Sequence, residues 1–72
     1  MKYPLTKTQK KYFNVIKDYI QQNEMSPSYR DIQKGVEAKS VSGVHTMLYQ
    51  LERRGWIKRL PTSARSIVIV ND

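Results

Sequence analysis

A stripe of polar side chains between residues 42 and 53 has the types and spacing of a hydrogen-bonding surface. Its members, three or four residues apart and so on one face of a helix, are Ser42, His45, Thr46, Tyr49 and Arg53. A face that only needed to be soluble would usually carry Glu, Lys, Gln and Ala. Short donors and acceptors near a helix start suit a helix that enters the major groove of DNA. An ordinary solvated face fits this helix alone equally well.

Single residues within the stripe have two interpretations each. His45 is the only histidine, and with no cysteine and no second histidine a zinc site has no ligand set. We therefore interpret His45 as a donor or acceptor at a base edge rather than as a simple surface histidine. Ser42 and Thr46 could equally be idle polar residues, and Gly43 could serve only close packing. Tyr49 could touch phosphate or cover the edge of the core.

Cations cluster directly after the stripe. The chain carries 13 Lys and Arg against 6 Asp and Glu, a net charge of +7, which is the electrostatic footprint of nucleic-acid binding. A membrane surface is the competing anionic partner; the lysines of the first helix leave it open without demanding it, and we expect duplex DNA and no membrane. The side chains expected to meet phosphate are Ser28, Lys39, Tyr49, Arg53, Arg54, Lys58, Arg59 and Arg65.

Several other classes of protein are disfavoured. The absence of cysteine excludes disulfides, thiolate metal sites and cysteine nucleophiles. Serines and lysines are plentiful, but no activated pair and no glycine-rich phosphate loop is recognisable, so we expect no catalysis, cofactor or metal. No apolar run approaches the ~20 residues of a membrane helix. The N-terminus lacks the apolar core of a signal peptide, which makes the cytoplasm the default location.

Two helices are expected to come before the stripe. Thr6 and Ser28 are good N-caps. Gln9, three positions after Thr6, completes a capping box, and Asp31, three positions after Ser28, is an acidic partner for the first turn of its helix. These caps predict helices from residue 7 to about 22 and from 29 to about 36. The N-terminal amides of the second helix could hold a phosphate beside Ser28. Gly35, near the end of that helix, would permit a close helix crossing.

The third helix carries the stripe. We expect Ser40 to cap it through its hydroxyl, and Gly55 to follow two arginines as a left-handed C-terminal cap. Its apolar side, at three- and four-residue spacing, consists of Val44, Met47, Leu48 and Leu51. Only residues 37–39 separate it from the second helix, which is a helix-turn-helix arrangement.

After Gly55 the pattern changes from helical to extended. Residues 56–60 and 67–70 are rich in β-branched and aromatic types, and a polar loop with a turn-forming proline joins them. They predict an antiparallel hairpin in which Ile67 and Ile69 share one face and Val68 and Val70 the other. The predicted fold is mainly α with a small antiparallel β-hairpin, a winged helix-turn-helix of three helices plus a two-stranded wing. We expect residues 1–72 to form a single DNA-binding domain.

The chain resembles the N-terminal DNA-binding domain of the LexA repressor family. The matching pieces, in order and essentially without gaps, are Leu5-Thr6, Gln9, Phe13, Met25-Ser26-Pro27-Ser28, Ile32, Lys39-Ser40, Leu48, Leu51, Arg53-Arg54-Gly55, Ile57, Arg65, Ile67 and Ile69. The resemblance implies a sequence-specific repressor of the SOS response that binds operator DNA as a dimer. It places the reading helix at residues 40–54 and a wing residue, Arg65, along the phosphate backbone. The base-facing positions that it implies are Ser40, Ser42, Gly43, His45 and Thr46.

Two departures from the family pattern matter. Reading helices of the LexA type carry Asn and Glu where this chain has Ser42, His45 and Thr46, so we expect an operator different from the usual SOS box. The family's second half, a self-cleaving serine–lysine peptidase that also dimerises, is absent from these 72 residues. The chain would then be part of a longer repressor, or a stand-alone domain without damage-induced cleavage. The rival function is a protein-interaction module that binds an acidic protein or another repressor.

Overall fold

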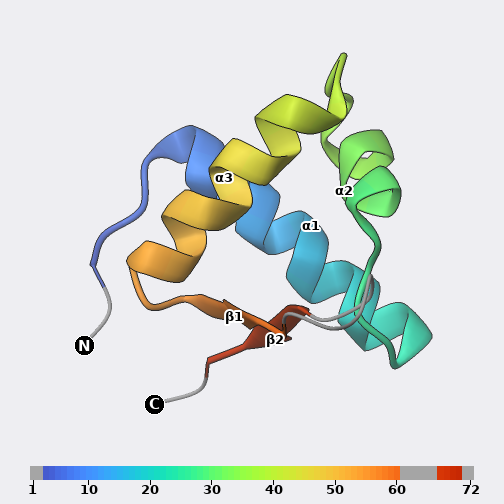
Figure 1. Cartoon of the computed structure of the whole chain (residues 1–72). Helices are drawn as coiled ribbons and strands as arrows, with labels where there is room; N and C mark the ends of the chain where they lie inside the picture. Colours follow the sequence, from blue (N-terminus) through green and yellow to red (C-terminus); the bar gives the residue numbers. More distant parts are fainter. Residues whose placement is uncertain (1–2, 61–66, 71–72) are drawn as a thin grey trace.

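Two capping boxes set the starts of the first two helices; the sequence predicted the box at Thr6 and, at Ser28, the cap alone. In the computed structural model, which describes residues 3–60 and 67–70, α1 spans Lys7–Asn23 and α2 spans Tyr29–Val36 (Figure 1). The Thr6 hydroxyl accepts from the Gln9 N–H at 3.2 Å, and the Gln9 side chain accepts from the Thr6 N–H at 3.0 Å. In the same way, the Ser28 hydroxyl accepts from the Asp31 N–H at 3.1 Å, and the Asp31 carboxylate accepts from the Ser28 N–H at 3.0 Å. The first helix is one residue longer than predicted: it runs through Asn23, and Glu24 caps its end with a left-handed φ of 55°.

The third helix, α3, spans Val41–Arg53 and begins without the predicted side-chain cap. Ser40 stands at the N-cap position with extended backbone, but its hydroxyl makes no capping hydrogen bond. The prediction was wrong because the Ser40 Oγ lies 3.0 Å from the Ser42 Oγ, so the two hydroxyls bond to each other. At the other end Gly55 has φ 85°, which confirms the predicted left-handed glycine.

A two-stranded sheet closes the fold. Strand β1 (Ile57–Arg59) pairs antiparallel with β2 (Ile67–Ile69), with Lys58 opposite Val68. Both strands are shorter than predicted, although the Val70 N–H still donates to the Trp56 carbonyl at 3.0 Å. Ile67 is buried and Val68 is 50% exposed, in agreement with the predicted alternation. The loop between the strands, residues 61–66, lies outside the described residues and with it Arg65.

The three helices and the sheet meet in one core, to which each element contributes. Figure 1 shows α3 in front of α1, with the hairpin below it. The buried apolar side chains are Tyr12, Ile16, Ile32, Val36, Val44, Leu48, Leu51, Ile57 and Ile67. Among the core-facing stripe of α3, only Met47 remains partly exposed. A buried polar bridge adds to the core, since the Gln9 amide donates to the Gln50 side chain at 2.7 Å and ties α1 to α3.

Candidate nucleic-acid interface

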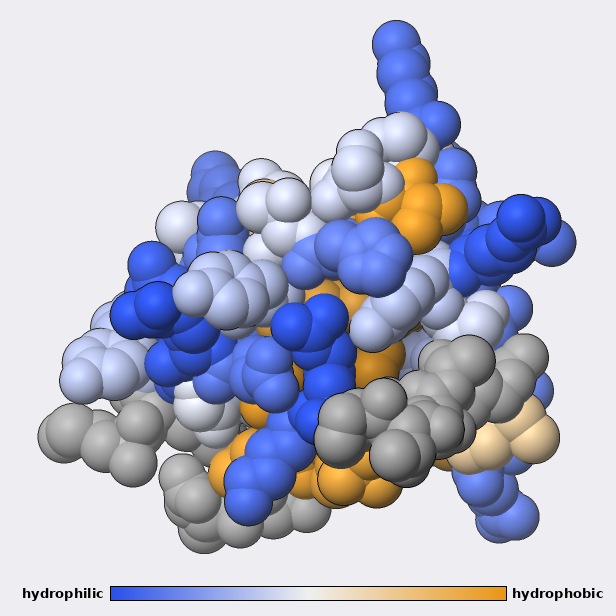
Figure 2. Space-filling view, viewed as in Figure 1, coloured by the Kyte–Doolittle hydropathy of each residue, from blue (hydrophilic) through white to orange (hydrophobic). Residues whose placement is uncertain are grey.

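The burial of one side of α3 fixes which side faces outward. Val44, Leu48 and Leu51 have no exposed surface, so the helix cannot rotate about its axis without opening the core. The side chains left exposed include Ser42, Gly43, His45, Thr46, Tyr49 and Arg53. In the space-filling view of this side, pale and blue residues cover most of α3, and hydrophobic surface shows beside its N-terminal end, in gaps and near the sheet (Figure 2). The polar stripe predicted from the sequence is therefore one continuous outer surface.

The side chains at the start of this surface are short and rich in hydroxyl groups. Nothing lies within 4 Å of where a Cβ atom of Gly43 would be, so close packing within the domain does not explain this glycine. The Thr46 hydroxyl donates to the Ser42 carbonyl at 3.2 Å, which uses its proton. Thr46 can thus offer a neighbouring molecule only a lone pair and its methyl group. In the Ser40–Ser42 pair one hydroxyl proton is used between the two oxygens, and the other is free to be donated.

The His45 ring packs against a second helix. Its centroid lies 4.3 Å from that of Tyr29, the first residue of α2, and the ring planes meet at 68° in an edge-to-face arrangement. The sequence did not identify Tyr29 as a partner of His45. The spacing of residues along either helix contains no signal for the contact, because the contact depends on how α2 and α3 cross.

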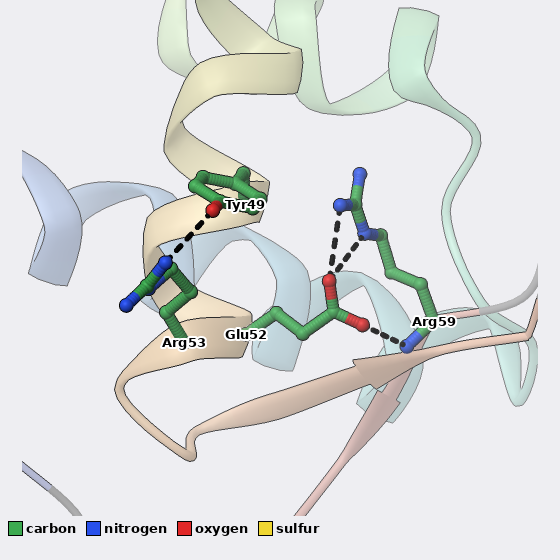
Figure 3. Close-up of polar contacts among 4 residues, drawn as sticks. All are labelled: Tyr49, Glu52, Arg53 and Arg59. Carbon is green, nitrogen blue, oxygen red and sulfur yellow. Dashed lines mark hydrogen bonds and ion pairs between the residues drawn. The ribbon is translucent and has the colours of Figure 1, made fainter.

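Tyr49 and Arg53 form a pair on the outside of α3 (Figure 3). An Arg53 Nη1–H donates to the Tyr49 hydroxyl at 2.9 Å, and the guanidinium carbon lies 5.6 Å from the Tyr49 ring centre. The hydrogen bond with Tyr49 raises the pKa of Arg53 above its ordinary value. Tyr49 is 50% exposed and so is no part of the buried core. Because its oxygen accepts from Arg53, its own proton is available for a phosphate oxygen.

Arg59 is turned inward onto Glu52. Its Nη2–H and Nε–H donate to one carboxylate oxygen at 3.0 and 3.3 Å, and its backbone N–H donates to the other at 3.4 Å (Figure 3). Partial burial lowers the pKa of Arg59, but its hydrogen bonds with Glu52 and the negative charge of that carboxylate outweigh this effect, and the pKa is raised overall. This guanidinium, which the sequence assigned to phosphate, already has an anionic partner inside the domain.

Arg54 is also engaged within the chain. Its Nη1–H donates to the Pro4 carbonyl at 2.7 Å, and its own carbonyl accepts from the Tyr3 N–H at 3.1 Å. The Trp56 indole N–H donates to the Tyr3 carbonyl at 2.6 Å. These three hydrogen bonds hold the N-terminal arm against the end of α3, so Arg54 has a structural role in the domain.

Comparison with known proteins fits this arrangement. The family model described as LexA DNA binding domain matches residues 1–66. The chain belongs to this family. LexA repressors of Staphylococcus aureus strains Mu3, N315 and USA300 are each 44% identical to it over 68 residues, which covers 94% of this chain and 33% of the relative. The chain therefore spans about a third of the length of these relatives. Its three helices and antiparallel hairpin form a LexA-type winged-helix DNA-binding domain.

Three further residues of this LexA-type domain were predicted to contact phosphate. Lys39, which precedes α3, and Lys58, which follows it, are both exposed. The half-buried Ser28 has both its hydroxyl and its backbone N–H bonded to Asp31, whose negative charge stands where a phosphate would approach. In residues 3–60 and 67–70, no group of His, Cys, Asp and Glu side chains is placed to hold a metal ion. None of the helices within these residues is long and apolar enough to cross a membrane.

Proposed function

We propose that this LexA-type domain recognises a specific operator in duplex DNA by placing the first two turns of α3 in the major groove. The observation that carries the proposal is the exposed start of α3, whose side chains are short and rich in hydroxyl groups, beside outward-facing cations. The proposed base-reading residues are Ser40, Ser42, Gly43, His45 and Thr46. Of these, Thr46 has its methyl group and a lone pair to offer, which suits the methyl group of thymine or an amino group of a base.

The proposed phosphate contacts form a belt around the reading surface. It consists of Lys39, Tyr49, Arg53, Lys58 and, outside the described residues, Arg65. Arg54, Arg59 and Ser28 are left out because Pro4, Glu52 and Asp31 already engage their polar groups. A domain of this size makes few base contacts, so we propose that two copies bind a two-fold operator and act there as a transcriptional repressor.

Salt dependence tests the belt. Removal of one phosphate contact should reduce the slope of log K against log salt concentration by about 0.9. We expect Lys39→Gln and Arg53→Gln each to flatten the slope by roughly that amount for each bound copy of the domain. The matched control is Lys11→Gln, because Lys11 is exposed on α1, the helix behind α3 (Figure 1). Fluorescence anisotropy with one labelled duplex between 50 and 200 mM salt measures all three variants. Over this range the affinity of a protein that makes about 6–10 phosphate contacts falls roughly a thousandfold or more. An unchanged slope for Arg53→Gln would remove it from the belt.

Base reading is tested at His45. The preferred duplex is first selected from a random pool with the wild-type domain. We expect His45→Ala to reduce the preference for this duplex over random DNA by about tenfold, since a good base contact contributes about 1–3 kcal/mol of discrimination. Binding to random DNA should change by less than about twofold, because phosphate contacts supply that affinity. A uniform loss on both duplexes would contradict base reading. Tight binding of an acidic protein with no duplex preference would favour the interaction-module alternative.

A further inference from the structure

Tyr29 is placed to control the direction of the His45 ring. His45 is exposed, so without a neighbour its ring would sample more than one staggered rotamer. The edge-to-face contact with Tyr29, at 4.3 Å between centroids, favours one of them. Pairs of this geometry are stabilising enough to bias such an equilibrium roughly fivefold. The contact therefore determines which edge of the imidazole faces outward from α3.

Tyr29 is itself held on several sides. It follows directly after the Ser28–Asp31 capping box and packs, half-buried, against the core. The start of α2 and the core thus hold the Tyr29 ring in place, and this ring in turn contacts the exposed ring of His45 in α3. Such support from packed neighbours is what a precise polar contact requires.

We propose that Tyr29 is a specificity-determining positioning residue, which fixes the His45 imidazole so that one ring nitrogen meets a single base pair. The inference rests on the proposed base-reading function and adds a residue that need not touch DNA. The proposed phosphate contacts do not involve the Tyr29–His45 contact, so loss of this contact should change sequence preference and leave random-DNA affinity intact.

The test compares Tyr29→Leu, which removes the ring, with Tyr29→Phe, which keeps the ring and removes the hydroxyl. In the free domain, the ring current of Tyr29 should shift the His45 ring protons in NMR spectra. We expect this shift to persist in Tyr29→Phe and to disappear in Tyr29→Leu. Unchanged His45 ring resonances in Tyr29→Leu would overturn the positioning role without any reference to DNA. Because Tyr29→Phe conserves the core packing, it remains informative if Tyr29→Leu folds poorly.

The DNA measurement uses the selected duplex and its single-base-pair variants. We expect Tyr29→Leu to relax preference about fivefold at the same base pair as His45→Ala, with Tyr29→Phe within about twofold of wild type. The double variant should be no worse than His45→Ala alone, because coupled residues are not additive. Additive losses, or relaxation at a different base pair, would overturn the proposal. If His45→Ala alters no base pair while the NMR shift is lost in Tyr29→Leu, base reading by His45 is wrong and the specificity role of Tyr29 falls with it.

Discussion

Gly43→Glu is expected to weaken DNA binding by about a hundredfold or more while making the domain more stable. Gly43 is the third residue of α3, and open space surrounds the position of its missing Cβ atom. A glutamate there would project from the proposed reading surface towards the phosphates, and like charges brought together at an interface cost several kcal/mol. The dissociation constant for the selected duplex, measured at one fixed salt concentration, gives the size of the loss.

The stability gain in the same variant has a separate cause. Glutamate at the third position of a helix can accept from the backbone N–H of the N-cap residue, here Ser40, whose own hydroxyl makes no capping bond. Replacement of glycine within a helix adds about 0.5–1 kcal/mol to the free energy of unfolding. In a domain of this size, each 1 kcal/mol raises the melting temperature by roughly 4–8 °C. A melting curve beside the binding curve therefore shows that the loss of binding is not a loss of folding.

Gly43→Gln separates charge from bulk. Glutamine has nearly the same shape as glutamate, and it can also complete the capping box. If Gln binds much more tightly than Glu, negative charge is the cause of the loss; if both bind equally weakly, the DNA approaches too closely for any side chain. Wild-type affinity in both variants would exclude Gly43 from the interface.

Gly35→Ala is expected to destabilise the domain by about 1–3 kcal/mol, the usual cost of overpacking. This is opposite to the normal effect of alanine in a helix, which stabilises by about 1 kcal/mol relative to glycine. A Cβ atom on Gly35 would lie 2.5 Å from Cγ1 of Val15, so α1 and α2 would have to separate. Val15 cannot easily turn aside, because a β-branched side chain within a helix has one strongly preferred rotamer.

The second helical glycine supplies the matched control. Gly43→Ala also replaces a glycine inside a helix, but nothing lies within 4 Å of the new atom. We expect its melting temperature to rise by a few degrees, while that of Gly35→Ala falls by roughly 4–8 °C for each 1 kcal/mol of destabilisation. Thermal denaturation followed by circular dichroism compares the two. A rise in both variants would mean that the α1–α2 crossing relaxes without cost.

The sequence by itself predicted features that depend on a few neighbouring residues. The N-caps at Thr6 and Ser28 each bond to a residue three positions further along, so their geometry is encoded within one helical turn. The polar and apolar sides of α3 follow from its periodicity in the same way. Even the close crossing at Gly35 could be predicted, since a glycine inside a helix has few other uses. The LexA resemblance, which depends on the order of such local pieces, was confirmed by the family match.

Only the tertiary structure decided which polar groups remain available for a partner. Arg54 and Pro4 are 50 positions apart, and His45 and Tyr29 lie on different helices, so no local pattern relates them. Arg53, Arg54 and Arg59 look alike in the sequence, yet one faces outward beside Tyr49 while the other two bond to groups of their own domain. A long guanidinium side chain bonds to whichever oxygen the folded backbone brings within its reach. That oxygen has no fixed position until the helices and the hairpin have packed together.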